Sequence, residues 1–159
     1  QLKDQGSFNN GVMDGQWTGW FDNGKINYQG FRKEGLKDGK WTFGHRNGKT
    51  REEGAYSSGV KDGAWTYYYD SGNIDYKCSY SNGAKDGKCT YYYEHGAKMR
   101  EESYKNDLLD GKSLMWGPRE NLIAERNYKN GVPHGKVVNY DDEGKILNTM
   151  YFKEGIKSK

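Results

Sequence analysis

The chain has 159 residues, which leaves room for one domain or one repeat array. Its net charge of +3 is the balance of 25 basic and 22 acidic residues spread along the sequence, so it has no polyanion-binding stripe and nucleic acid is excluded as a partner. A mean hydropathy of −1.18 with 15% aromatic residues is too polar for a thick core and too aromatic for disorder. Apolar runs are only a few residues long, so none spans a bilayer.

Glycine marks an internal repeat of 24 residues. One series consists of Gly15, Gly39, Gly63, Gly87, Gly111 and Gly135. A second consists of Gly24, Gly48, Gly72, Gly96 and Gly144, with Glu120 as its exception, and a third of Gly11, Gly35, Gly59, Gly83, Gly131 and Gly155, with Asp107 as its exception. The period predicts a single array over residues 1–159, with a half repeat at 1–14 and full repeats at 15–38, 39–62, 63–86, 87–110, 111–134 and 135–158.

Each repeat reads as two short strands and two turns. Asn23-Gly24, Asn47-Gly48 and Ser71-Gly72 lie between β-prone runs and predict two-residue hairpin turns. The other turn of each repeat is predicted to be longer, as in residues 130–135, with Pro133 off the hydrogen-bond ladder because it lacks an amide proton. No window shows a helical apolar stripe. The predicted fold is therefore all-β, an elongated, twisted single antiparallel sheet built as a meander of β-hairpins.

Two-residue turns at these positions fix the register, and with it the face on which each side chain lies. One face is predicted to form the core from Trp17, Trp41, Trp65, Tyr67, Tyr69, Tyr91, Tyr93, Ile26, Tyr28, Ile74, Tyr76, Tyr56, Tyr80 and Tyr104. The opposite face is predicted to carry polar residues, a ladder of threonines and a row of aromatics. We call this row the outer aromatic row; it consists of Trp20, Tyr68, Tyr92, Trp116 and Tyr140.

The same register places each strand tryptophan opposite a glycine, so that an indole covers a residue with no side chain. The predicted pairs are Trp17 with Gly6, Trp41 with Gly30 and Trp65 with Gly54. In the next repeat the equivalent pair is Cys78 and Cys89, the only cysteines. Two readings stay open for this pair: a disulfide formed in an oxidising compartment, or two reduced thiols that fill the same space.

No constellation of catalytic or metal-binding residues emerges. His45, His95 and His134 occupy three different positions of the repeat, so they are expected to share no focus, and two thiols are too few for a zinc site. In the pairs Glu52-Glu53 and Glu101-Glu102, adjacent strand residues point to opposite faces and cannot flank one bond. The glycine-rich turns lead into strands rather than helices, so they form no phosphate cradle. We expect no enzyme activity, no catalytic residue, no metal and no cofactor.

The outer aromatic row is the feature expected to act, because a regular row of exposed rings on a sheet can bind a protein, a lipid surface or the faces of sugars. A purely structural role, in which the rings shield the backbone of a one-layer sheet, is the alternative. The leading interpretation is a protein-binding scaffold. The second is an envelope module that binds carbohydrate or a lipid surface through the same rings.

The repeat resembles the MORN (membrane occupation and recognition nexus) family, in its bacterial variant of the antitoxin-like type. The resemblance extends from about Phe8 to Lys157 and is carried by DGKWTFGHRNGKTREEGAYSSGVKDG at 38–63, DGAWTYYYDSGNIDYKCSYSNGAKDG at 62–87 and KNGVPHGKV at 129–137. It implies an array of antiparallel hairpins with a non-enzymatic scaffold role, often beside other domains. Unit 111–134 departs from the pattern at residues 116–120 and predicts a bulge or a different turn. Choline- and cell-wall-binding repeats offer a second resemblance, through their W/Y-Y-Y runs.

Compartment and assembly follow as expectations. The paired cysteines, the absence of an initiator Met and the excess of Tyr and Trp over Leu favour a bacterial periplasmic, outer-membrane or secreted location, with a signal segment removed or a trimmed sequence as alternatives. An open sheet leaves two strand edges that must be capped, blunted or paired with a second copy, so a homodimer through a sheet edge is one expected assembly.

Overall fold

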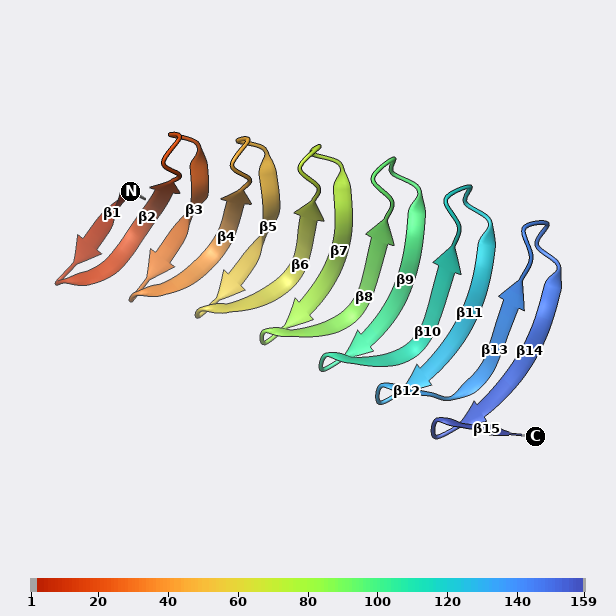
Figure 1. Ribbon diagram of the computed structural model, residues 1–159. Coiled ribbons are helices and arrows are strands. Elements are labelled where there is room, and N and C mark those ends of the chain that lie inside the picture. Colours follow the sequence, from red (N-terminus) through yellow and green to blue (C-terminus); the bar gives the residue numbers. More distant parts are fainter. Residues whose placement is uncertain (1–2, 159) are drawn as a thin grey trace. The chain divides into compact units, whose positions relative to one another are not determined.

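A computed structural model describes residues 3–158, and this part of the chain contains strands and turns but no helix. The strands are β1 (Lys3–Asn9), β2 (Val12–Trp20), β3 (Ile26–Lys33), β4 (Leu36–Gly44), β5 (Thr50–Ser57), β6 (Val60–Tyr68), β7 (Ile74–Ser81), β8 (Ala84–Tyr92), β9 (Lys98–Lys105), β10 (Leu108–Trp116), β11 (Leu122–Lys129), β12 (Val132–Pro133), β13 (Gly135–Tyr140), β14 (Ile146–Lys153) and β15 (Ile156–Ser158). They form one sheet in sequence order, with β12 beside β11, which confirms the all-β antiparallel meander (Figure 1).

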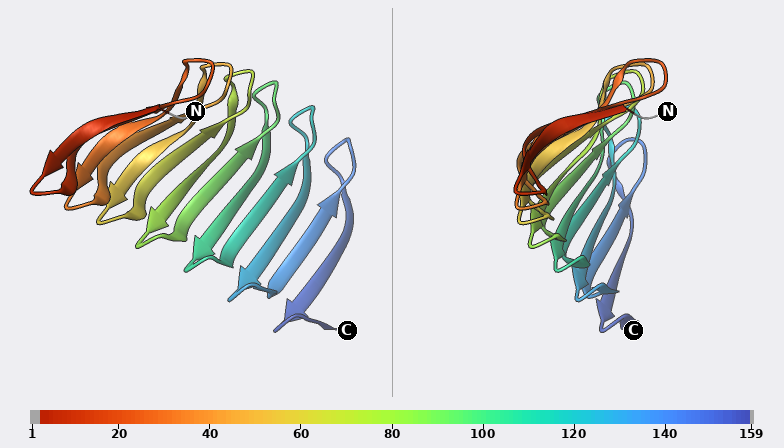
Figure 2. Two further views of the ribbon diagram at one scale, coloured as in Figure 1. Left: turned by 60° about the vertical axis from the view of Figure 1, so that its left-hand side comes forward. Right: turned by 90° about the vertical axis from the view of Figure 1, so that its left-hand side faces the viewer.

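Contacts divide the chain into two compact units. The first runs to Asp75 and includes Tyr80–Gly83, and the second comprises Tyr76–Ser79 and the chain from Ala84 onward. Within each unit the strands form a single layer, with tight turns at one end of the strands and longer loops at the other (Figures 1 and 2). Each unit therefore buries side chains against their own neighbours on one face rather than between two layers.

The two-residue turns are those for which the sequence predicts longer loops. At Asn130-Gly131 both residues have positive φ, 49° and 82°, and Lys129 pairs with Val132 across the turn. These values match the type I′ turn that suits the twist of a hairpin. The amide of Gly131 also donates to the carbonyl of Leu109 at 2.8 Å, so each turn is tied to the hairpin before it.

The turns at Asn23-Gly24, Asn47-Gly48 and Ser71-Gly72 are longer than predicted, so that prediction is wrong. At the first, only Gly24 has positive φ (79°), and the amide of Phe21 donates to the carbonyl of Lys25 at 2.8 Å, which closes a three-residue loop. An Asn-Gly pair fits both kinds of turn because each needs a left-handed residue at the glycine. The pair alone therefore does not decide between them.

The predicted register nevertheless holds, because a bulge compensates for the extra loop residue. Trp20 pairs with Ile26 while Gly19 pairs with Tyr28, which leaves one unpaired residue on β3. Beyond this bulge the strands keep the alignment expected for a two-residue turn. Ile26, predicted in the core, is 42% exposed, since it lies between the loop and the bulge.

A second bulge explains the first glycine series. On β4, Asp38 pairs with Phe31 and Trp41 with Gly30, so that Gly39 is part of an irregularity and has a φ of 68°. A left-handed residue in a bulge favours glycine. The bulge brings Trp41 over Gly30 after a turn whose own register would not align them.

Two further predictions about turns are corrected. Pro133 lies in the short strand β12, where it pairs with Tyr128 and its carbonyl accepts from the amide of Gly155 at 2.9 Å; its missing amide proton is not needed for this contact. Unit 111–134 does contain a bulge, between Met115 and Trp116, but other units have the same bulge. Its turn is not different, because the amide of Gly117 donates to the carbonyl of Asn121 as in the other loops. Glu120 adopts the glycine conformation there, with a φ of 65°.

The core of the first unit is a row of stacked rings on one face of the sheet. Trp41 and Trp65 are fully buried, and they cluster with Trp17 and Phe43. The predicted tyrosines of this unit pack around them, namely Tyr28, Tyr56, Tyr67 and Tyr80. The indole nitrogen of Trp41 donates to the carbonyl of Phe31 at 2.9 Å, so burial leaves it satisfied. The predicted core face and the Trp41–Gly30 pairing are confirmed.

The second unit replaces the indoles with smaller and more polar side chains. Cys78 and Cys89 form a disulfide, and both are buried. Next to them Glu102, 6% exposed, pairs across the sheet with Ser113. The Glu102 carboxylate accepts from the hydroxyl of Tyr104 at 2.8 Å. Hydrogen bonds therefore accompany the burial of this charge, as a low-dielectric site requires.

Candidate functional site

The face opposite the aromatic core carries linked side chains from three neighbouring strands. In the first unit, Lys40 lies 2.9 Å from Glu53, and the hydroxyl of Tyr68 donates to Glu53 at 2.7 Å. Alternation along the strands places these side chains on the face away from Trp41 and Trp65. We call such a set an outer triad. It fixes the Tyr68 ring through its polar end.

The second unit repeats this arrangement. Lys112 lies 2.9 Å from Glu125, and the hydroxyl of Tyr140 donates to Glu125 at 2.9 Å. All three residues stand three repeats beyond their counterparts in the first unit. The recurrence arises because the repeats carry the same residue types at these three positions.

A variant of the outer triad surrounds Trp116. Lys88 lies 2.8 Å from Glu101, and Lys98 lies 3.4 Å from the same carboxylate. The ammonium of Lys98 also lies 5.5 Å from the ring centroid of Trp116, within the range of a cation–π contact. Here the ring has no hydroxyl, and a lysine connects it to the carboxylate.

These contacts shift the pKa values of the carboxyls and phenols in opposite directions. The hydrogen bonds from Lys40 and then Tyr68 lower the pKa of Glu53. Burial, followed by the hydrogen bond to Glu53, raises the pKa of Tyr68 to about 12. At neutral pH Glu53 is therefore a carboxylate and Tyr68 a neutral phenol.

All five residues of the outer aromatic row are half-buried. Four of them end a strand and pair with the first residue of the next strand at a shift in register; these are Trp20, Tyr92, Trp116 and Tyr140. A bulge redirects the side chain beside it. In each unit part of each ring is therefore accessible to solvent, and neighbouring side chains cover the remainder.

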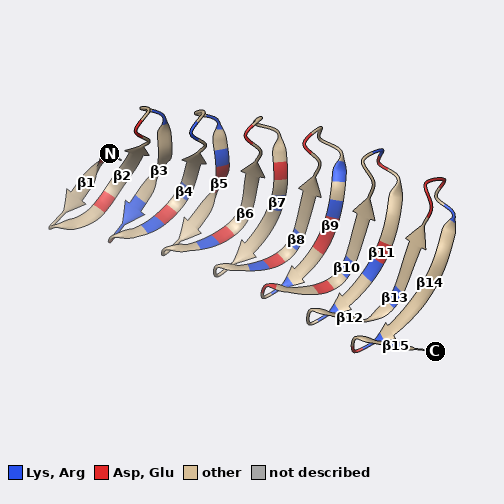
Figure 3. Ribbon diagram, viewed as in Figure 1, with Lys and Arg blue, Asp and Glu red and all other residues tan. Residues whose placement is uncertain are grey.

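Charge on the strands is balanced within short distances (Figure 3). Each outer triad pairs its lysine with a glutamate, and Arg46 pairs with Asp22 across neighbouring loops. Neither sign of charge therefore dominates the surface of the triads. This balance matters for the kind of partner that the face can attract.

Lysines on the core face were missed by sequence reasoning. The ammonium of Lys37 lies 4.9, 4.6 and 4.8 Å from the ring centroids of Trp41, Phe43 and Tyr56. Burial, and then the charge of Arg32, lowers the pKa of Lys37. The signal was available, because Lys-Asp-Gly recurs with its lysine four residues before Trp41 and Trp65 on the same strand, but lysine is ordinarily assigned to solvent.

The histidines, cysteines and acidic residues of the 3–158 segment form no large cluster. Groups of three or more metal-binding side chains are absent from this part of the chain. His45 lies 2.7 Å from Asp70, whereas His95 contacts the carbonyl of Pro118, so these two histidines serve separate loops. Helices that could cross a membrane are likewise absent from the described residues.

A one-layer sheet of equal hairpins that presents partly exposed rings in regular positions defines a repeat module that acts through its surface. The family model described as the MORN repeat variant matches residues 13–34, 61–82, 85–106 and 133–154, more than half of the chain, and the chain belongs to this family. MORN repeats are binding modules for proteins or membranes and are non-catalytic as a type. No curated protein matches the chain. Residues 107–132, where the sequence departs from the pattern, lie outside the matched segments.

Proposed function

We propose that this chain is a non-catalytic scaffold, a single array of MORN-like repeats, that binds a protein partner through the outer aromatic row and its triads. The observation that carries the proposal is the recurrence of Tyr68 and Tyr140 in the same hydrogen-bonded setting in the two units. Tyrosines held in place lose little conformational freedom on binding, and each offers an apolar ring beside a polar group. Aromatic residues of this kind are enriched at protein interfaces.

The balance of charge favours a protein over an anionic lipid surface. In the two triads that contain a tyrosine, one lysine is paired with one glutamate, so little net attraction to anionic headgroups remains there. Stacking on sugars needs a freely accessible ring face, whereas these rings are half-buried. Carbohydrate and lipid binding therefore remain the alternative functions, and we expect neither in direct assays.

The test identifies the partner first and then measures it. A photo-reactive phenylalanine derivative placed at position 140 is used to cross-link proteins from the source organism, and the captured protein is identified and purified. Calorimetry then compares Tyr68→Ser and Tyr140→Ser with the wild type. We expect each substitution to weaken binding about tenfold or more, as loss of an interface aromatic does.

Val60→Ser and Val132→Ser are the matched controls, one in each unit. Both valines are apolar and exposed, at 44% and 43%, and they lie beside the two-residue turns, away from the triads. We expect these variants to bind like the wild type. Unchanged affinity of the tyrosine variants would disprove the surface, and co-sedimentation with peptidoglycan or phosphatidylglycerol vesicles would favour the alternative functions.

A further inference from the structure

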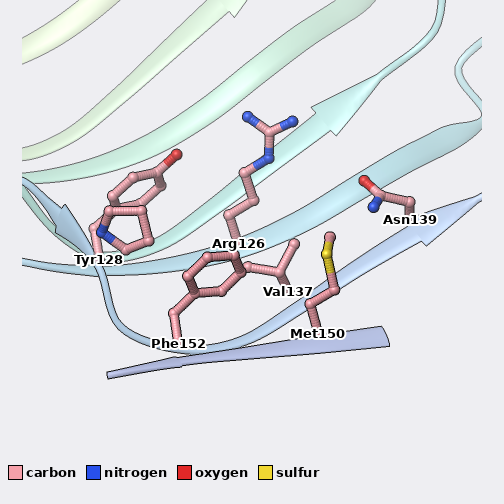
Figure 4. A pocket seen from close by; sticks show the side chains of 7 residues that line it. Arg126, Tyr128, Val137, Asn139, Met150 and Phe152 are labelled. Carbon is pink, nitrogen blue, oxygen red and sulfur yellow. The ribbon is translucent and has the colours of Figure 1, made fainter. Parts of the chain in front are cut away.

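A hollow of about 230 Å³ opens on the core face of the second unit, where the repeat no longer supplies tryptophan (Figure 4). Val137 occupies the position that Trp41 has in the first unit, and Arg126 occupies that of Gly30. Both residues line the hollow, and Val137 itself is buried. A small side chain has thus replaced the indole, and the arginine opposite leaves part of the indole's volume unfilled.

The rest of the lining is mostly apolar. Pro133, Met150 and Phe152 form further walls together with the ring of Tyr128, and the amide of Asn139 is the remaining polar group of the lining. In Figure 4 the stem of Arg126 rises beside Val137 and Phe152, and its guanidinium extends beyond them. The hollow therefore combines mostly apolar walls with one amide, that of Asn139, and one positive charge, that of Arg126.

The guanidinium of Arg126 differs from those of the other arginines on the core face. Arg32 donates to the carbonyl of Gly35 at 2.8 Å, and Arg100 lies 3.0 Å from the buried carboxylate of Glu102. Arg126 forms no hydrogen bond, ion pair or ring contact with any residue of the 3–158 segment. A guanidinium whose five N–H groups have no protein acceptor, on an arginine that is half-buried as a residue, is suited to binding a carboxylate in a two-pronged geometry.

We propose that this hollow binds the C-terminal residue of a polypeptide, with its carboxylate on Arg126 and its apolar side chain against Val137, Met150 and Phe152. The volume lies below the roughly 300–1,000 Å³ of pockets for drug-sized molecules and suits one large amino-acid side chain. The inference rests on the proposed function, because it assumes a protein partner. It assigns a separate site, on the opposite face from the triads, to the end of that partner's chain.

The probe is the peptide acetyl-Ala-Ala-Leu with a free carboxylate, and its C-terminal amide is the neutral control. Binding is followed by NMR through the methyl groups of Met150 and Val137. We expect the acid to shift both sets of signals and to bind at least tenfold more tightly than the amide, since a hydrogen bond to a charged group is lost in the amide. Equal binding of acid and amide, or no binding of either, overturns the proposal.

Two variants test the two parts of the site. Arg126→Gln is expected to reduce affinity for the acid about tenfold, whereas Arg119→Gln, which removes the same charge from an exposed loop of the same unit, leaves it unchanged. Val137→Leu adds one methylene to the floor of the hollow without setting an indole against Arg126, and it is expected to weaken binding of the acid about tenfold while Arg126 remains. Wild-type affinity in Arg126→Gln or in Val137→Leu contradicts the assignment.

A further arm separates a polypeptide end from a free small acid. 4-Methylpentanoate carries the same carboxylate and a leucine-like tail without the peptide, and we expect it to bind at least tenfold more weakly than the tripeptide. Equal affinity would overturn the assignment to a polypeptide terminus. The result is independent of the triad test: loss of partner binding in Tyr140→Ser with wild-type peptide binding separates the two sites.

Discussion

The indole of Trp41 lies directly over Gly30, so that a Cβ atom built on Gly30 would come within 2.3 Å of Trp41 Cδ2. We expect Gly30→Ala to lower the free energy of unfolding by about 2 kcal/mol, because the fully buried indole has no room to move. Urea denaturation measures the change. In a Trp41→Ala background the same substitution should cost less than about 0.5 kcal/mol, and a full penalty there would show that the cause is not this contact.

Glu120 holds a left-handed conformation that glycine holds in the other loops, with a φ of 65°. Glycine adopts this conformation without the steric cost that glutamate has, but it also makes the unfolded chain more flexible. We expect the first effect to be larger, so that Glu120→Gly stabilises the protein by roughly 0.5 kcal/mol. Thermal denaturation checks the sign. Arg119→Gly in the same loop, where φ is not positive, is the control and should be neutral or destabilising.

The disulfide between Cys78 and Cys89 closes a short loop, with a sequence separation of 11. Its reduction should lower the free energy of unfolding by about 2–3 kcal/mol, since the unfolded chain regains freedom. Denaturation with and without dithiothreitol gives the difference. The double variant Cys78→Gly, Cys89→Trp restores the pair of the first unit; we expect it to fold and to be indifferent to dithiothreitol, and a strong response to the reductant would contradict the assignment of the effect to this bond.

Stability should fall in acid because the pKa of Glu53 is lowered in the folded state by Lys40 and Tyr68. A carboxyl whose folded pKa is depressed stabilises the protein above its unfolded pKa, near 4.3, and that contribution is lost as pH falls through the folded value. For this partly exposed group we expect roughly 0.5–1 kcal/mol. Denaturation of the wild type and Glu53→Gln across pH 2–7 should give curves that differ at neutral pH and converge in acid; a constant separation would refute the linkage.

The pairing of Trp41 with Gly30 could be predicted because an indole and a missing side chain fit each other in any repeat with that register. The turn at Asn23-Gly24 could not, since the same dipeptide satisfies a two-residue turn and a three-residue loop. The extra loop residue and the bulge shift the register in opposite directions and compensate for each other. The side chains were therefore assigned to the correct faces of the sheet although the turn was predicted wrongly. A single dipeptide is therefore a poor guide to the type of turn, whereas the alternation of residues along a whole strand predicts the faces of the sheet reliably.

The details of the candidate site depend on which side chains contact one another across strands. Assigning each residue to a face of the sheet does not reveal these contacts. The sequence placed Tyr68 on the outer face, but its half-burial results from Glu53 and Lys40 on neighbouring strands. Lys37 was unexpected over the core rings because a charged side chain is assigned to water unless its aliphatic stem is considered. The hollow beside Arg126 required knowing how much volume the exchange of tryptophan for valine leaves open.

Each complementary pair, such as Gly30 with Trp41, sits on the two strands joined by one two-residue turn, while the three-residue loops separate one pair from the next. A genetic duplication or deletion with its breakpoints in those loops would add or remove both members of a pair together. No tryptophan would then be left without the glycine that it covers. Breakpoints in the tight turns would split the pair. Repeats are therefore gained or lost with least damage to the core when both ends of the inserted or deleted segment lie in the three-residue loops.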